Sequence, residues 1–142
     1  MNTNSVFEVK GVSKIFGTEK EVQVRALNQV DLKIERGEFI ALVGPSGSWK
    51  STLLNIMSGL DVPTSGDAFL YGKDISLLSG NELSDFRRDH IGFIFQAYNL
   101  IPVLTVKENI EYVMLLQGVD SKERKLRVKN ILKDVGLEGM EE

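Results

Sequence analysis

The feature that most constrains this chain is a glycine- and serine-rich loop at residues 44–52, GPSGSWKST. A short apolar run, FIALVG at 39–44, leads into it, and an apolar pattern with helical spacing follows over residues 50–60. The run is continuously apolar, which predicts a strand buried on both faces, as in a parallel sheet covered by helices. A buried strand, a glycine-rich loop and a helix in this order are typical of a loop that binds phosphate groups.

The loop offers the groups that a triphosphate needs. Consecutive backbone N–H groups at a helix N-terminus donate to phosphate oxygens, and the helix dipole favours the anion. Lys50 would reach the β- and γ-phosphates, the Ser51 hydroxyl would ligate Mg²⁺, and Thr52 would help to hold the α-phosphate side. We therefore predict a site for ATP and Mg²⁺ made of Gly44, Pro45, Ser46, Gly47, Ser48, Trp49, Lys50, Ser51 and Thr52. The alternative is a tight strand-to-helix turn that binds no ligand.

Trp49 departs from the usual pattern of such a loop. The pattern G-x-x-x-x-G-K-[ST] requires glycine directly before the lysine, and this chain has tryptophan there. Backbone angles that glycine adopts freely cost other residues about 1–2 kcal/mol. The indole also adds bulk beside the β-phosphate. We expect nucleotide binding to be weakened or abolished, and replacement of Trp49 by glycine to strengthen ATP binding.

The remaining secondary structure follows from the spacing of apolar residues. Alternation over residues 5–16 and 22–35 predicts two half-buried antiparallel strands, and residues 67–75 predict another alternating strand. IGFIFQ at 91–96 is predicted to be a second buried strand. Helices are expected over residues 50–60, 80–89 and 121–135 and from Thr105 onward, with Ser79 and Glu82 at capping-box spacing. The order indicates a mixed α/β fold with an antiparallel layer.

Composition excludes several classes of site and partner. The chain has no cysteine and one histidine, His90, which excludes disulfides and a cysteine nucleophile and leaves little room for a histidine metal site. No run of 18 apolar residues and no signal peptide is visible, so a cytoplasmic protein is expected. The basic stretch at 121–133 is consistent with a nucleic-acid surface or a solvated helix face. We favour the helix face and no nucleic-acid partner, because apolar residues keep helical spacing and no aromatics are interleaved.

Several separate motifs resemble one known family. After the loop come GLDVPTSG at 59–66, RRDHIGFIFQAYNLIP at 87–102 and LTVKENI at 104–110. Together they resemble the ATP-binding subunit of ATP-binding cassette (ABC) transporters, most of all the lipoprotein-releasing and macrolide-export type, over its N-terminal portion. The resemblance implies an α/β fold: an incomplete P-loop NTPase core with an antiparallel β layer and the start of a helical subdomain. It divides the chain into residues 1–96, the nucleotide-binding core, and residues 97–142, the Q-loop exit and partial helical subdomain.

The resemblance also implies roles for two further residues. Phe16 matches the A-loop aromatic that stacks on the adenine ring; the alternative is a core aromatic at a strand end. Gln96 matches the Q-loop glutamine that contacts Mg²⁺ and the attacking water; the alternative is a polar residue at a strand end. Lys50 and Gln96 are then the expected catalytic residues, and Ser51 and Gln96 the expected metal ligands. Residues 97–104 would lie near the groove that receives a membrane partner.

The family implies a function for the full-length form. Two subunits would dimerise head to tail, bind two ATP, and power export or extraction through a transmembrane subunit or domain, peripheral on the inner face of the cell membrane. No LSGGQ signature follows Gln96 in the sequence, nor an apolar strand ending in Asp-Glu. We therefore expect ATP hydrolysis by this chain alone to be impaired. The alternatives are a non-catalytic interaction module that docks on a membrane protein, and a P-loop small-molecule kinase.

Overall fold

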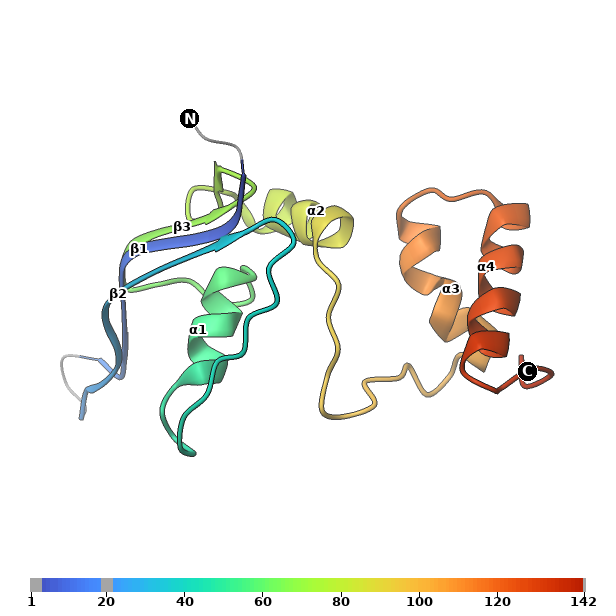
Figure 1. Ribbon diagram of the computed structural model, residues 1–142, viewed down its shortest axis with the longest axis horizontal. Helices are drawn as coiled ribbons and strands as arrows, with labels where there is room; N and C mark the ends of the chain where they lie inside the picture. The colour runs from blue at the N-terminus through green and yellow to red at the C-terminus, as the bar shows by residue number, and fades with distance from the viewer. Residues whose placement is uncertain (1–3, 19–21, 142) are drawn as a thin grey trace. The chain divides into compact units, whose positions relative to one another are not determined.

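The computed structural model describes residues 4–18 and 22–141. They fall into two compact units, Met1–Arg87 and Arg88–Glu142, each of which is considered by itself (Figure 1). The elements are β1 (Ser5–Phe16), β2 (Val24–Glu35), α1 (Lys50–Met57), β3 (Ser65–Leu70), β4 (Lys73–Asp74), α2 (Gly80–His90), α3 (Val106–Leu116) and α4 (Ser121–Asp134). The division of roles predicted after residue 96 is functional and stays a prediction.

The first unit is built on a four-stranded sheet in the order β2-β1-β3-β4. Every neighbouring pair is antiparallel, which confirms the interpretation of the two long alternating segments. Val9 and Val12 of β1 are three residues apart, yet they are 1% and 0% exposed. An irregularity in the β1–β2 register between them, where Gly11 has a φ of 57°, brings both side chains to the core face.

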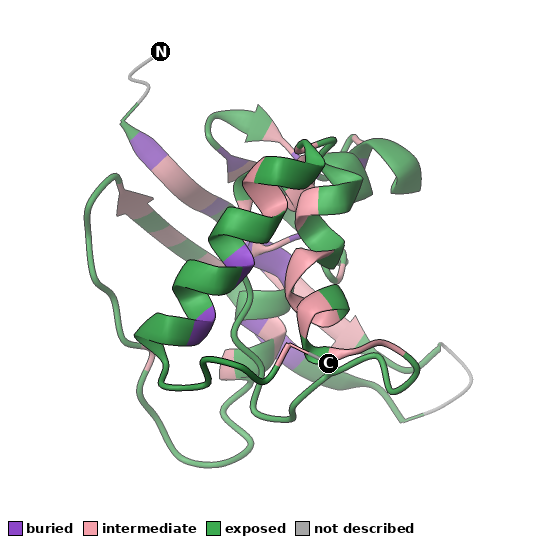
Figure 2. Ribbon diagram, turned by 90° about the vertical axis from the view of Figure 1, so that its right-hand side faces the viewer, coloured by how far each residue is buried: buried purple, intermediate pink, exposed green. Residues whose placement is uncertain are grey.

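Helix α1 supplies the other half of this core. Its Leu53, Ile56 and Met57 are buried, and the helix contacts β1, β2 and β3. Figure 2 shows that the buried residues, in purple, form short stretches of the strands and helices and that most of the ribbon is exposed. Gly59 ends the helical segment with a φ of 69°, a left-handed angle that suits glycine, as the sequence predicts. The sheet and α1 therefore fix the position of the loop that precedes the helix.

Two predicted strands are not strands in the structure. Residues 39–44 and 91–96 carry no strand assignment, and none of the four strands in the described ranges pairs with them. Phe39 is 96% exposed, Val43 88% and Ile94 103%. A buried strand of a parallel sheet needs hydrogen-bonded neighbours on its edges to satisfy its backbone groups. The described part of this chain offers none to either segment, so the predicted burial is wrong here.

The strand predicted over residues 67–75 is in fact a hairpin. β3 and β4 pair antiparallel, and the chain reverses between them at Tyr71 and Gly72. These two residues have φ angles of 50° and 75°, the left-handed values that a two-residue hairpin turn requires. The glycine was visible in the sequence, but its role as the second turn residue was not recognised.

Helix α2 begins where its capping signal predicts. The Ser79 N–H donates to Glu82 Oε2 at 3.0 Å, and the Glu82 N–H donates to Ser79 Oγ at 3.4 Å. The Ser79 hydroxyl also donates to Glu82 Oε2, at 2.7 Å, and together with the Ser79 N–H it holds the pKa of the Glu82 carboxyl below its ordinary value. The helix therefore has its first backbone N–H groups satisfied within its own sequence.

The second unit pairs α3 with α4, the two helices predicted near the C-terminal end. Val128 and Leu132 of α4 are 2% and 1% exposed, whereas no residue of α3 is buried. An ion pair joins Arg124 Nε to Glu111 Oε2 at 3.2 Å. The unit therefore has a small core, and a small core supplies little stability.

Thr105 caps α3, and its replacement by alanine is expected to destabilise the second unit by about 1 kcal/mol. The Thr105 Oγ1 accepts from the Glu108 N–H at 3.3 Å, and the Thr105 N–H donates to Glu108 Oε2 at 2.8 Å. Urea unfolding followed by helical circular dichroism measures the loss. Lys129→Ala, at an exposed position of α4, is the control and should change stability by less than about 0.5 kcal/mol.

The same cap has a pH dependence of definite sign. The hydrogen bonds from Thr105 lower the pKa of the Glu108 carboxyl in the folded chain. A lowered pKa means that the stabilisation is complete above the ordinary glutamate pKa and is lost as the pH falls through the lowered value. The Thr105 N–H that donates to Glu108 is a backbone group, so the matching variant is Glu108→Ala. The stability difference between the parent chain and Glu108→Ala should shrink in acid, and a constant difference down to the lowest pH would contradict this account of the cap.

Candidate functional site

The loop at residues 44–49 is a tight turn that leads directly into α1. The Ser48 N–H donates to the Pro45 carbonyl at 3.3 Å, and the Ser48 hydroxyl donates to the same oxygen at 2.9 Å. A Cβ on Gly44 would lie 2.8 Å from Ser48 Oγ. Gly47 has a φ of 78°, which glycine adopts without strain. The close approach of Ser48 favours glycine at position 44 and the backbone angle favours glycine at position 47, as expected for a loop that wraps a small ligand.

Lys50 is folded onto this loop. Its ammonium donates to the Gly44 carbonyl at 2.9 Å, the Pro45 carbonyl at 2.8 Å and Ser48 Oγ at 3.1 Å. An ammonium has three donors, and all three are directed at loop oxygens. The positive charge is thus fixed at the loop, where a bound phosphate would meet it.

The first turn of α1 has no protein anion of its own. Trp49 is the N-cap residue and makes no side-chain capping hydrogen bond, and no acidic residue lies in the first turn. Ser51 is exposed and Thr52 is partly exposed in this turn. Free N–H groups at a helix N-terminus favour an anion, and the Lys50 charge adds to that effect. The structure therefore brings Lys50, Ser51 and Thr52 together with the loop backbone.

Trp49 has a left-handed backbone conformation at the position where the loop pattern has glycine. Its φ of 61° and ψ of 21° lie in the left-handed region, which agrees with the expected strain at this position. Its indole stacks on the ring of Phe16, with centroids 5.8 Å apart and planes inclined by 29°. The sequence predicts both residues as ligand contacts, and nothing in it indicates that they contact each other.

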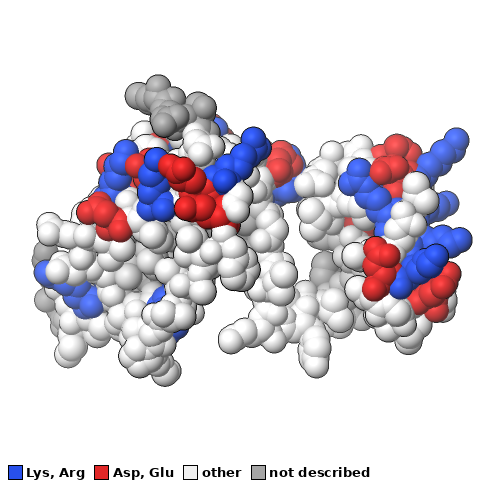
Figure 3. Space-filling model, viewed as in Figure 1, with Lys and Arg blue, Asp and Glu red and all other residues white. Residues whose placement is uncertain are grey.

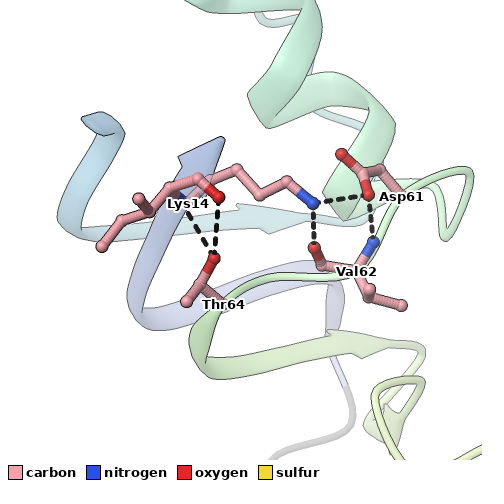
Figure 4. A network of polar contacts seen from close by, with 5 residues as sticks. Lys14, Asp61, Val62 and Thr64 are labelled. Atoms are coloured by element: carbon pink, nitrogen blue, oxygen red, sulfur yellow. Dashed lines mark hydrogen bonds and ion pairs between the residues drawn. The ribbon is translucent and has the colours of Figure 1, made fainter. Parts of the chain in front are cut away.

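A second set of contacts anchors the end of β1 that carries Phe16 (Figure 4). The Lys14 ammonium lies 2.7 Å from Asp61 Oδ1 and donates to the Val62 carbonyl at 2.7 Å. Next to it, the Ile15 N–H donates to Thr64 Oγ1 at 3.0 Å. The Lys14 ammonium also stands 5.2 Å from the Phe16 ring centroid. Lys14 is not among the residues that the sequence predicts for the site, although a residue two positions before Phe16 on a strand lies on the same face.

Asp61→Asn is expected to lower stability by about 1–2 kcal/mol, because the Lys14 ammonium would lose its charged acceptor. The Lys14 side chain is only 12% exposed, so water replaces that acceptor poorly. Thermal unfolding of the whole chain measures the effect. Asp67→Asn, at an exposed position of β3, is the matched control. Equal unfolding midpoints for Asp61→Asn and the parent chain would show that the ion pair contributes nothing.

Gln96 belongs to the second unit, and its side chain is exposed. Its role as a ligand of Mg²⁺ and of the attacking water stays a prediction. Among the described residues, no group of three or more histidine or acidic side chains is placed to hold a metal ion.

Opposite charges intermingle on the surface in view in Figure 3. On the sheet, Lys10 pairs with Glu8 and Lys33 with Glu35. On α4, Arg127 pairs with Glu123 at 2.7 Å. This pairing fits the interpretation of the basic stretch as a solvated helix face. No helix within the described ranges is both long enough and apolar enough to span a membrane.

The second unit contains an apolar pocket of about 580 Å³. The segment that follows Gln96 forms one side of it, and residues of α3, of α4 and of the segment directly after α4 form the rest. Leu100, Ile101, Pro102 and Leu104 contribute from that segment. Residues 100–104 thus contribute apolar side chains to this pocket. A contact of residues 97–104 with a membrane partner stays a prediction.

Comparison with known proteins identifies relatives for nearly the whole chain. The family described as ABC transporter matches residues 27–142. The macrolide export ATP-binding/permease protein MacB of Escherichia coli is 44% identical over 136 residues, which are 96% of this chain and 21% of MacB. The ABC transporter ATP-binding protein YtrE of Bacillus subtilis is 48% identical over 86% of this chain and 52% of YtrE. A Methanocaldococcus jannaschii ABC transporter ATP-binding protein, MJ1508, is 47% identical over 93% of this chain and 58% of its own length.

Solved structures agree on the fold. The ATP-binding cassette MJ0796, in a dimeric post-hydrolysis state bound to ADP and Pi, superposes with a TM-score of 0.84 at 40% identity. The match covers 95% of this chain and 59% of the cassette. The chain thus spans little more than half of the cassette and has an incomplete P-loop NTPase core with an antiparallel β layer. The family match, the sequence identity to the relatives and the superposition on a solved cassette all point to the same family. The chain therefore belongs to the ABC transporter family, within its ATP-binding cassette.

Proposed function

We propose that this chain is part of the ATP-binding subunit of an ABC transporter and that its loop binds the phosphate chain of ATP. The observation that carries the proposal is the Lys50 ammonium, held at the loop by three oxygen acceptors beside an uncapped helix N-terminus. Phosphate oxygens are stronger acceptors of an ammonium than carbonyl oxygens, because they are charged. A triphosphate would therefore draw Lys50 from the Gly44 and Pro45 carbonyls onto its β- and γ-oxygens.

The residues present also suit Mg²⁺. This ion prefers oxygen ligands and keeps several waters, so it needs few protein side chains when phosphates are bound. The exposed Ser51 hydroxyl on the first turn of α1 would hold it, together with the carbonyl oxygen of Gln96. When bound, the ion supplies neutralisation of the phosphate charge. Lys50 orients the phosphates, and Gln96 would position the attacking water.

The proposed partners follow from the relatives. MacB is by name an export ATP-binding/permease protein, and MJ0796 forms a dimer. We infer that the full-length form dimerises and couples ATP binding and hydrolysis to export or extraction through a transmembrane partner at the inner face of the cell membrane. The apolar surface at residues 97–104 supports a contact with that partner. Burial of the exposed Leu100, at 64%, would favour the contact.

A second candidate is a non-catalytic module that docks on the same membrane partner without turnover. Trp49 favours it, because tryptophan occupies the position of the loop glycine and covers the aromatic expected to receive the base. The two candidates differ in ATP turnover and share the phosphate site. Turnover and binding must therefore be measured separately.

Calorimetric titration of the whole chain with Mg·ATP, followed by a phosphate-release assay, tests the proposal. The expected result is saturable binding at one site with little or no steady-state phosphate release. Sustained release would favour the catalytic subunit over the docking module. No heat of binding with either the parent chain or Trp49→Gly would contradict the phosphate site and with it the proposed function.

A further inference from the structure

The strongest unassigned feature is the stack between Phe16 and Trp49. The Phe16 ring and the Trp49 indole lie with centroids 5.8 Å apart and planes inclined by 29°, a stacked arrangement. Phe16 is 39% exposed and Trp49 38%, so each ring shields part of the other. The contact joins the last residue of β1 to the residue directly before Lys50. The stack therefore joins Phe16, the residue expected to receive the base, to the loop that is expected to bind the phosphates.

The spacing leaves no room for a base between the rings. Stacked carbon atoms approach to about 3.5–4.0 Å, so a purine inserted between two rings needs about 7–8 Å between them. The observed 5.8 Å between centroids is shorter. The face of Phe16 that is turned to Trp49 is therefore covered by the indole, as it would be covered by a bound base.

Both rings are held by their surroundings. The Lys14 ammonium lies 5.2 Å from the Phe16 centroid and is itself fixed by Asp61 and the Val62 carbonyl. A cation over an aromatic face adds to the stability of that ring position. On the other side, Trp49 stands between the Ser48 turn and the first residue of α1, so its backbone is fixed at both ends. The stack is thus an interaction between two anchored segments.

The phosphate-facing groups are separate from the stack. Lys50 is directed at the Gly44 and Pro45 carbonyls and Ser48 Oγ, and it makes none of its hydrogen bonds to either ring. Gly44 and Gly47 keep the tight turn that brings backbone N–H groups together. Covering the base position therefore leaves the anion-binding part of the loop intact.

We propose that Trp49 determines ligand specificity: its indole takes the place of a purine on Phe16, and the loop binds a triphosphate chain without selecting adenine. This inference rests on the proposed function of the loop as a phosphate site. ATP, GTP and inorganic tripolyphosphate then bind through the same groups, and the base of a nucleotide points to solvent. Removal of the indole uncovers Phe16 and restores a preference for a nucleotide over tripolyphosphate.

The test compares Mg·ATP, Mg·GTP and Mg·tripolyphosphate by calorimetry on the whole chain and on three variants of Trp49. The parent chain should bind all three ligands within about threefold of one another. Trp49→Asn removes the ring, and asparagine tolerates left-handed backbone angles. Trp49→Gly also removes the ring, and glycine adopts these angles more freely than asparagine. Both should tighten ATP by at least about tenfold, the effect of stacking one base on an aromatic ring, with tripolyphosphate unchanged. Trp49→Phe keeps a ring and should show no gain.

A second substitution tests whether the tighter binding of ATP depends on the Phe16 ring. Phe16→Leu added to Trp49→Asn should cancel the tightening of ATP, because the base would lose its platform. In the chain with Trp49 intact, Phe16→Leu should shift the emission of the single tryptophan, which reports the stack without any ligand. An unshifted emission would contradict the stack in solution.

The outcomes separate this inference from the function on which it rests. If the parent chain binds ATP tenfold tighter than tripolyphosphate, or if Trp49→Phe gains as much as Trp49→Asn, the role of the indole is wrong while the phosphate site stands. If no variant binds tripolyphosphate or ATP, the phosphate site itself is wrong, and the specificity inference falls with it.

Discussion

Lys50→Met is expected to weaken binding of Mg·tripolyphosphate and Mg·ATP by about 10- to 100-fold, the loss typical of one hydrogen-bonded charge. The Lys50 ammonium is the charge that the structure places on the loop, at 2.8 Å from the Pro45 carbonyl. Methionine keeps the length of the side chain without its charge, so the packing of the stem is preserved. Calorimetry on the whole chain measures both affinities.

The matched control is Lys129→Ala on α4, which removes one positive charge from an exposed helix position. If a general positive field attracted the ligand, this control would weaken binding as much as Lys50→Met. Unchanged affinity in Lys50→Met would contradict the assignment of the loop as the phosphate site. Similar unfolding midpoints for the two variants would show that the loss comes from the contact and not from unfolding.

Ile56→Ala is expected to destabilise the first unit by about 2–5 kcal/mol, because it opens a cavity in a small core. Ile56 is 0% exposed on the face of α1 that contacts the sheet. A loss of this size is a large part of the total stability of a small domain. Urea unfolding, followed by the emission of Trp49, measures the loss of stability. Trp49 is a suitable probe because it is the N-cap residue of α1, the helix that contains Ile56.

Phe39→Ala is the informative comparison for this prediction. Phe39 is 96% exposed, and its replacement should change stability by less than about 0.5 kcal/mol. If Phe39→Ala were as destabilising as Ile56→Ala, residues 39–44 would be packed as the buried strand that the sequence indicates. The pair of variants therefore decides between the observed exposure and the predicted burial.

Local signals in the sequence predicted most elements correctly. The alternation of Val30, Leu32 and Ile34 with charged residues predicted β2 and its antiparallel pairing. The helical spacing after Thr105 predicted where α3 begins, and the capping-box spacing of Ser79 and Glu82 predicted where α2 begins. Such signals work because period-2 burial and side-chain capping depend on residues close together in the chain. The loop with Lys50 on α1 was predicted for the same reason.

Features that depend on distant residues were not predictable. Whether Phe39 or Ile94 is buried depends on neighbouring strands, and nothing in an apolar run shows whether those neighbours are present. The contact of Phe16 with Trp49 joins residues far apart in the chain, and only the folded sheet brings them together. The φ of Trp49 was foreseen, because the loop pattern itself requires a left-handed residue there.

Titration of the whole chain with Mg·ATP, followed by the emission of Trp49, tests the central claim most directly. Trp49 is the single tryptophan, and it lies between Phe16 and Lys50 at the loop. We expect a saturable change in emission that Mg·tripolyphosphate reproduces and that Lys50→Met shifts to ligand concentrations about 10- to 100-fold higher. Emission that stays constant at every ligand concentration, together with no binding by Trp49→Asn in calorimetry, would contradict the claim that this loop is a phosphate site.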